Sequence, residues 1–221
     1  NNGNLGRRRS LGKLAELSDL LVRDPLLGKS GIGHTRWATH GKPSVNNAHP
    51  HMTAEVAVVH NGIIENFQEL REYLQKRGIQ HTTDTDTETI ALLTQAMIED
   101  GHEPIEAAKK TIDKLTGAFA LCFLFEGHND LMVIARKGSP LAIGIGKGEM
   151  FVGSDAIALS PMTNKISYLE EGDFAVLTRA NVQVWDHSGA LVEREIKTIN
   201  TQNTQVQKDG YQHFMEIEIY E

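Results

Sequence analysis

The strongest constraint on the fold is a change in the pattern of apolar residues at Gly117. Before this glycine, apolar residues recur at helical spacing in segments that we expect to form helices beginning at residues 10, 66, 84–88 and 103. Between the first two of these helices, residues 56–59 read as a short apolar strand that runs into His60-Asn61-Gly62. After it, short apolar runs bounded by turn residues read as strands at 118–125, 131–135, 141–145, 174–177 and 182–185. Helices and strands are segregated instead of strictly alternating, and this favours an α+β layered fold over a doubly wound one.

The length and composition are those of an ordinary globular protein. A chain of 221 residues forms one large domain or two small ones, and 40% hydrophobic with 23% charged residues is close to the average. The longest apolar run, Ala118 to Phe125, is too short to span a bilayer, and the polar start at Asn1 does not resemble a signal peptide. We therefore expect a cytoplasmic protein that does not contact membranes.

The charge and the cysteine count exclude further classes. The net charge is -7 and the only basic run is Arg7–Arg9, so we expect no nucleic-acid partner. The single cysteine, Cys122, rules out a disulfide framework and a cysteine-rich zinc site. It lies within an apolar run, which favours a buried core thiol over a nucleophile.

Three polar clusters carry the residue types that chemistry requires: residues 34–41 with 47–51, residues 60–62, and residues 85–88. Each also has an ordinary structural interpretation. Asn61-Gly62 between apolar segments is typical of a tight turn, and Asp86 at a helix start is typical of a cap. Glycines 144, 146 and 148 lie between two strand-like runs, so they predict a hairpin and not a phosphate-binding loop.

A histidine-based metal site is one alternative for these clusters. Five histidines fall within thirty residues, at positions 34, 40, 49, 51 and 60. However, no HExxH helix or cysteine partner accompanies them, so we predict neither a metal nor a cofactor.

Recognition of a free amino acid is the chemistry that unites the clusters. An arginine fork suits a carboxylate and an acid suits an ammonium group, and Arg36 and Asp86 supply these groups. Hydrolysis of a side-chain amide also needs hydrogen-bond donors for the oxyanion. Asn61 could supply its side-chain amide and Gly62 its backbone N–H. The sequence permits this arrangement without requiring it.

At these clusters the chain resembles the glutaminase domain of the glutamine–fructose-6-phosphate aminotransferase family. The resemblance covers essentially the whole chain and rests on the segments HTRWATHG (34–41), NAHPH (47–51), VVHNGIIEN (58–66), TDTE (85–88), LTGAFA (115–120), KGSPL (137–141), GSDAIAL (153–159) and YLEEGD (168–173). It implies a four-layer αββα sandwich of the N-terminal nucleophile hydrolase type.

The resemblance also implies roles for individual residues. Arg36 would hold the glutamine carboxylate, Asp86 its α-ammonium group, and Asn61 with Gly62 the oxyanion. The loop that covers bound glutamine would contain Trp37, Thr39 and His40, with His49 close by. The family's nucleophile is a cysteine at the mature N-terminus, but this chain begins with Asn1, so we expect a few dozen residues of the family pattern before it.

The resemblance finally implies a domain organisation. Residues 1–197 would form the glutaminase domain, and residues 198–221 a linker toward a fructose 6-phosphate-binding isomerase domain of a homodimeric full-length protein. The complete reaction would convert L-glutamine and D-fructose 6-phosphate to L-glutamate and D-glucosamine 6-phosphate. A glutamine- or partner-binding module without catalysis is the second hypothesis, and a histidine-based metal protein is the third.

Overall fold

The computed structural model describes residues 3–199. The helices of this range are α1 (Leu14–Arg23), α2 (Phe67–Lys76), α3 (Asp86–Glu99), α4 (Pro104–Ile112) and α5 (Ala156–Leu159). The strands are β1 (His51–Met52), β2 (Val56–Ile64), β3 (Gly117–Phe125), β4 (Met132–Lys137), β5 (Ala142–Ile145), β6 (Met150–Gly153), β7 (Lys165–Tyr168), β8 (Phe174–Leu177), β9 (Val182–Trp185), β10 (Leu191–Val192) and β11 (Ile196–Thr198).

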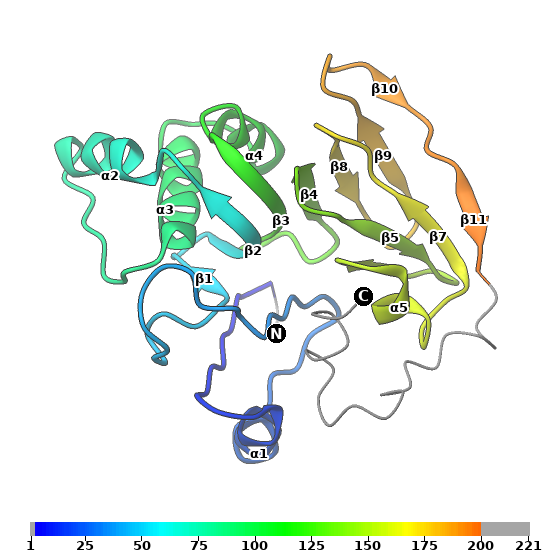
Figure 1. Cartoon of the computed structure of the whole chain (residues 1–221), viewed down its shortest axis with the longest axis horizontal. Coiled ribbons are helices and arrows are strands. Elements are labelled where there is room, and N and C mark those ends of the chain that lie inside the picture. The colour runs from blue at the N-terminus through cyan, green and yellow to red at the C-terminus, as the bar shows by residue number, and fades with distance from the viewer. Residues whose placement is uncertain (1–2, 200–221) are drawn as a thin grey trace, which may run out of the picture.

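Two antiparallel sheets form the centre of the molecule (Figure 1). The larger sheet has the strand order β1-β2-β3-β4-β8-β9-β10, and the smaller has the order β11-β7-β5-β6. Helices α2, α3 and α4 cover one face of the larger sheet, and its other face packs against the smaller sheet. The short helix α5 covers the far side of the smaller sheet through Ala156 and Leu159. The order of layers is helix, sheet, sheet, helix, which confirms the predicted αββα sandwich.

Strand β3 shows how the sequence builds these layers. Side chains of a strand alternate between its two faces. Leu121 and Phe123 pack toward the helices, whereas Ala120 and Cys122 pack toward the smaller sheet. Both faces are buried, which explains the continuous apolar run. Cys122 is a core residue as predicted, and burial raises the pKa of its thiol to about 12.

The helices of the first layer begin and end close to the predicted positions. Thr85 caps α3 by accepting a hydrogen bond from the backbone N–H of Glu88. Gly78 follows α2 with a φ of 80°, a conformation that favours glycine at a helix end. Asn66 precedes α2 but does not cap it, because its side chain instead bonds Lys114 and Thr116.

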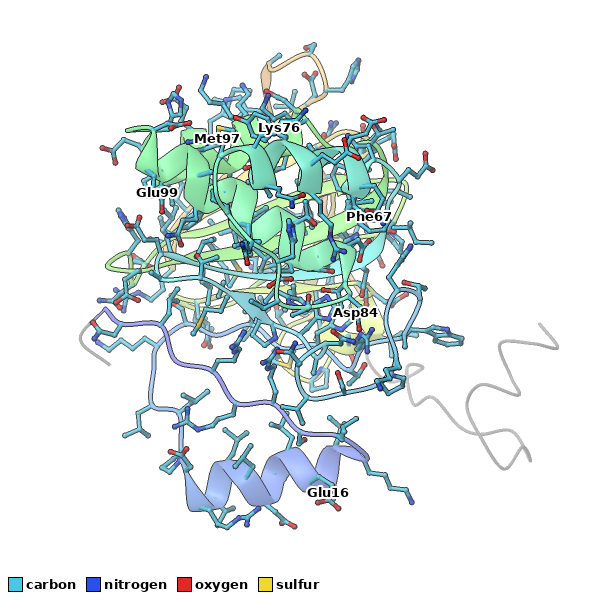
Figure 2. All side chains as sticks on the ribbon, turned by 90° about the vertical axis from the view of Figure 1, so that its left-hand side faces the viewer. Glu16, Phe67, Lys76, Asp84, Met97 and Glu99 are labelled. Carbon is cyan, nitrogen blue, oxygen red and sulfur yellow. The ribbon has the colours of Figure 1, made fainter. Side chains whose placement is uncertain are left out.

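Helix α1 differs from the prediction in position and in packing. It begins at Leu14 and not after Ser10, and it ends at Arg23. None of its residues is buried. Figure 2 shows that α1 stands apart, on the side of the molecule opposite to α2 and α3. Among the described residues, no helix is long and apolar enough to cross a membrane.

Several strand predictions need correction. The prediction gave no bounds for β6 and omitted β7; both strands belong to the smaller sheet. Thr198, which we had assigned to a linker, is the last residue of β11 and pairs with Lys165. The remaining linker positions from 200 onward lie outside the described residues. The glycine-rich run at 144–148 does form the predicted hairpin, because Ile145 of β5 pairs with Met150 of β6.

Candidate active site

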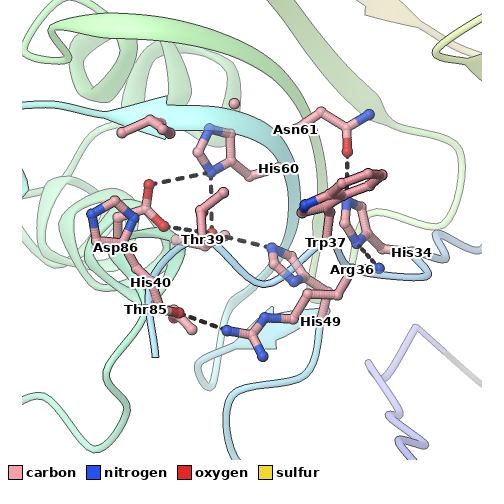
Figure 3. A pocket seen from close by; sticks show the side chains of 13 residues that line it. His34, Arg36, Trp37, Thr39, His40, His49, His60, Asn61, Thr85 and Asp86 are labelled. Atoms are coloured by element: carbon pink, nitrogen blue, oxygen red, sulfur yellow. Dashed lines mark hydrogen bonds and ion pairs between the residues drawn. The ribbon is translucent and has the colours of Figure 1, made fainter. Parts of the chain in front are cut away.

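A cavity of about 250 Å³ lies between the start of α3, the middle of β2 and the segment 34–49 (Figure 3). Its lining contains all eight predicted site residues: Arg36, Trp37, Thr39, His40, His49, Asn61, Gly62 and Asp86. It also contains residues to which the sequence assigned no role: His34, His60, Ile63, Thr85 and Thr87. Segments as far apart in the chain as those of His34 and Thr87 therefore converge on one pocket.

Asn61 and Gly62 lie within a strand, so the tight-turn interpretation is wrong. β2 continues to Ile64, and Asn61 and Gly62 pair with Ala120 and Phe119 of β3. Alternation along β2 turns His60 toward the helix layer and Asn61 toward the opposite face. Gly62 has a φ of 122°, which an L side chain rarely adopts.

His34 connects Asn61 with Arg36. Its Nε2 lies 2.6 Å from Asn61 Oδ1, and its Nδ1 accepts a hydrogen bond of 2.7 Å from the backbone N–H of Arg36. Figure 3 shows the side chains of His34 and Asn61 pointing toward each other at the edge of the pocket. Burial lowers the pKa of His34, which leaves the ring neutral at pH 7.

The Arg36 guanidinium holds the loop that follows it. Nη2 donates to the carbonyl oxygens of His40 at 2.6 Å and Gly41 at 2.8 Å, and Nη1 donates to that of Lys42 at 3.4 Å. Arg36 is also the only residue other than glycine with a positive φ among residues 3–199, at 49°. Such a conformation is uncommon for a side chain of this size and occurs at functional sites. Trp37 beside it is 71% exposed.

Asp86 is placed by the first turn of α3 and by strand β2. Its Oδ2 accepts a hydrogen bond of 2.9 Å from the backbone N–H of Ile64, and the Thr87 hydroxyl lies 3.4 Å from its Oδ1. The residue is buried. This buried carboxylate at the pocket wall is a fitting acceptor for a cationic group.

A group of buried histidines surrounds the carboxylate. His49 Nε2 and His60 Nδ1 each lie 3.1 Å from the Thr87 hydroxyl. Burial lowers the pKa of His49 to about 2, and burial likewise lowers the pKa of His60 to about 4, although Asp86 at 3.8 Å acts in the opposite direction. Both rings are therefore neutral at pH 7. Alternation along β2 could have predicted that His60 shares a face with the buried Val58.

Cys122 and His51, which the sequence analysis considered for chemical roles, do not line the pocket. Cys122 does not line the pocket, because it is buried between the two sheets. His51, one of the five clustered histidines, bonds the Thr85 hydroxyl at 3.0 Å from behind the pocket wall. Within residues 3–199, no group of three histidine, cysteine, aspartate or glutamate side chains is arranged to hold a metal ion.

Comparison with known proteins assigns the family. A family model described as a glutamine amidotransferase domain matches residues 34–161, a range that includes all eight predicted site residues. The chain belongs to this family. The match begins with the loop that carries Arg36 and extends through the β5–β6 hairpin to α5, so it includes the whole pocket, strands β1 to β4 of the larger sheet and β5 and β6 of the smaller one.

Curated relatives confirm the predicted resemblance. The glutamine–fructose-6-phosphate aminotransferase (isomerizing) of Bradyrhizobium diazoefficiens is 56% identical to this amidotransferase domain over 217 residues. The corresponding protein of Brucella abortus is 54% identical over 220 residues. These alignments cover 98% and 100% of the chain but 36% of each relative. The chain thus spans about a third of the length of the curated relatives that it matches.

Solved structures confirm the fold. Glutamine phosphoribosylpyrophosphate amidotransferase from B. subtilis matches with a TM-score of 0.58 at 24% identity, over 72% of this chain and 35% of that one. A structure described as the allosteric regulatory enzyme of purine biosynthesis matches with a TM-score of 0.55 at 24% identity, over 66% and 32%. The predicted fold of the N-terminal nucleophile hydrolase type is therefore confirmed for this amidotransferase domain.

Proposed function

We propose that the pocket binds L-glutamine and that this domain hydrolyses its side-chain amide. Arg36 would bind the carboxylate, Asp86 the α-ammonium group, and Asn61 with Gly62 the oxyanion. The observation that carries the proposal is the convergence of these four residues, from three separate segments, on one cavity of about 250 Å³. The cavity combines a guanidinium, a buried carboxylate and amide donors, the groups that a free amino acid amide requires.

The loop from Trp37 to His40 supports the proposal as a cover for bound glutamine. Trp37, Thr39 and His40 line the pocket from the side of the 34–49 segment, and His49 lines the same pocket. Arg36 already bonds the carbonyl oxygens of His40 and Gly41. A carboxylate that binds the same guanidinium would therefore act directly on the position of this loop.

The proposed chemistry is acyl transfer through a thioester. A cysteine thiolate would attack the amide carbon, ammonia would leave, and water would release L-glutamate. Following the family resemblance, we assign this role to a cysteine at the mature N-terminus with its own amino group as the base. Cys122 does not fit, because burial raises the pKa of its thiol to about 12 and it lies outside the pocket.

We further propose that the released ammonia converts D-fructose 6-phosphate to D-glucosamine 6-phosphate in the complete protein. The names of the 54–56% identical relatives support this proposal. Residues 1–197 would form the glutaminase domain, joined by the segment toward residue 221 to an isomerase domain, in a cytoplasmic homodimer. The relatives are nearly three times as long as this chain, which leaves room for such a domain.

Substitution of Arg36 tests the proposed pocket. The Arg36→Ala variant should bind L-glutamine and L-glutamate about ten- to a hundredfold more weakly, because it loses hydrogen bonds between charged groups worth about 1.5–3 kcal/mol. Calorimetry on the chain measures the affinity, and the fluorescence of the exposed Trp37 should shift as the ligand covers it. Arg179→Ala is the control, since Arg179 pairs with Asp130 outside the pocket.

Ammonia release separates catalysis from binding alone. The complete gene product containing this chain should release ammonia from L-glutamine, and Arg36→Ala should reduce kcat/KM at least tenfold. If glutamine binds and no ammonia is released, the domain is a binding module, the alternative favoured by the burial of Cys122. If Arg36→Ala bound L-glutamine as tightly as the wild type does, Arg36 would not bind the carboxylate.

A further inference from the structure

We propose that His34 is a positioning residue that sets the orientation of the Asn61 side-chain amide, and so decides which end of that amide faces the substrate. The inference rests on the proposed function, in which Asn61 donates a hydrogen bond to the oxyanion. Two contacts carry it: His34 Nε2 lies 2.6 Å from Asn61 Oδ1, and His34 Nδ1 lies 2.7 Å from the backbone nitrogen of Arg36.

The backbone contact determines the tautomer of His34. A backbone N–H can only donate, so His34 Nδ1 must be the unprotonated nitrogen of the ring. A neutral imidazole then carries its proton on Nε2, and this N–H must donate to its neighbour. The atom of Asn61 that faces His34 is therefore its oxygen. Burial lowers the pKa of His34, and its hydrogen bond with Asn61 acts in the opposite direction.

The orientation matters because the two ends of an amide have similar shapes and opposite roles. With Oδ1 bound to His34, the NH2 group of Asn61 is directed away from that ring. Within residues 3–199, this NH2 group donates no hydrogen bond. It is therefore available to an oxyanion in the cavity that Asn61 lines. The opposite orientation would present a carbonyl oxygen, which repels developing negative charge.

The surroundings of His34 keep its ring in place. The ring stacks on His49 with 4.3 Å between centroids and an interplanar angle of 27°. Because it bonds the backbone of Arg36 as well as the side chain of Asn61, one imidazole joins the proposed carboxylate clamp to the proposed oxyanion donor (Figure 3). Loss of its hydrogen bonds should therefore affect kcat through Asn61 and KM through Arg36.

Nuclear magnetic resonance of the wild-type chain tests the tautomer without an activity assay. Long-range ¹H–¹⁵N correlation should show His34 at pH 7 with a protonated Nε2 and an unprotonated Nδ1, assigned by loss of its signals in His34→Phe. The Asn61 NH2 resonances should shift in the same variant, whereas His102→Ala, a substitution outside the pocket, should leave them unchanged. Protonation at Nδ1, or Asn61 resonances that do not respond to His34→Phe, would overturn the inference.

A double-mutant cycle on kcat in the complete gene product tests the functional link. Loss of one oxyanion donor typically lowers kcat about 10²–10³-fold. His34→Phe keeps a ring that can stack on His49. In the wild-type background it should lower kcat at least about tenfold. In an Asn61→Ala background it should lower kcat by no more than about twofold further. If His34→Phe lowered kcat by the same factor in the Asn61→Ala background as in the wild type, His34 would not act through Asn61.

The two experiments separate this inference from the proposed function. If the wild-type protein releases no ammonia from glutamine, the proposed function fails, and the resonance experiment still decides whether His34 orients Asn61. If the wild-type protein is active and the tautomer is Nδ1–H, the inference about His34 fails while the proposed function stands.

Discussion

At the scale of single residues, the site depends on a backbone position that suits glycine alone. A Cβ atom on Gly62 would lie 2.1 Å from the carbonyl oxygen of Ala118, and the φ of 122° is itself unfavourable for other residues. The clash is with the backbone of the adjacent strand, so no side-chain movement can relieve it. Pairing of β2 with β3 next to Asn61 therefore requires glycine here.

Gly62→Ala should lower the free energy of unfolding by at least about 2 kcal/mol, from backbone strain and the clash together. Gly148→Ala is the matched control, because Gly148 also has a positive φ, 74°, but open space around its Cβ position. That control should cost about 1 kcal/mol. Urea denaturation measures the unfolding free energy of both variants. If both lost the same unfolding free energy, the contact with Ala118 would be relieved in solution.

At the scale of elements, the first turn of α3 is stabilised by a carboxylate that reaches back to the preceding loop. Glu88 accepts hydrogen bonds from the backbone N–H groups and the hydroxyls of Thr82 and Thr83. Burial acts to raise the pKa of Glu88, but these hydrogen bonds outweigh it and the pKa is lowered. The same turn carries Asp86, so this network supports the pocket wall.

Glu88→Gln should cost about 2 kcal/mol of unfolding free energy at pH 7, since hydrogen bonds to a charged acceptor are lost. A lowered pKa in the folded state means that the carboxylate contributes stability above its unfolded pKa of about 4.3 and loses it as the pH falls through the folded value. The difference in unfolding free energy between Glu88→Gln and the wild type should therefore become smaller as the pH falls below about 4. Urea titrations at several pH values measure it, and a constant difference would argue against a charge-dependent network.

Helices α1 and α3 both contain leucines, but they differ in packing: α1 has no buried residue, whereas most residues of α3 are buried. Leu14 of α1 is 65% exposed, whereas Leu93 of α3 is fully buried. Leu93→Ala should destabilise the protein by about 2–5 kcal/mol, and Leu14→Ala by less than about 0.5 kcal/mol. Denaturant unfolding of the two variants provides the test. A large loss for Leu14→Ala would mean that α1 packs against the rest of the protein in solution.

For the molecule as a whole, stability depends on pH through two pocket histidines, His49 and His60, and through His51 behind the pocket wall. Burial lowers the pKa of His49 to about 2 and the pKa of His51 and His60 to about 4, against about 6.5 in an unfolded chain. Near pH 5.5, between these values, the unfolded chain therefore binds nearly three more protons than the folded one at these positions. Strands β1 and β2 of the larger sheet and helix α3 border this region, so its protonation acts on the packing of the first helix layer against that sheet.

Stability should consequently fall on acidification from pH 6.5, with a slope approaching about 4 kcal/mol per pH unit near pH 5.5. The sign follows because lowered histidine pKa values contribute stability above the unfolded pKa and lose it as the pH decreases. Urea unfolding from pH 7.5 to 5 measures the slope, and His51→Gln should reduce it by about 1.4 kcal/mol per pH unit. A flat profile above pH 5 would show that these rings are charged in the folded protein.

Much of this molecule follows from local sequence pattern. Helices α2, α3 and α4 and strands β2, β3, β4, β5, β8 and β9 lie close to the predicted segments, because apolar periodicity reflects burial directly. Strand β7 could not be predicted in this way. It is a strand of four residues with exposed ends, and its structure comes from pairing with β5, in which Tyr168 lies opposite Ala142.

The layered α+β class follows from the apolar pattern of the sequence. Residue chemistry indicated Arg36, Asn61, Gly62 and Asp86, and the resemblance to a known family added the other pocket residues, Trp37, Thr39, His40 and His49. Only the tertiary structure decided how those residues are held. It placed Asn61 inside a strand, directed Arg36 onto the carbonyl oxygens of His40 and Gly41, and set His34 between Arg36 and Asn61. Hydrogen-bond partners depend on which segments meet in space, and that is decided by packing of the sheets and not by local pattern.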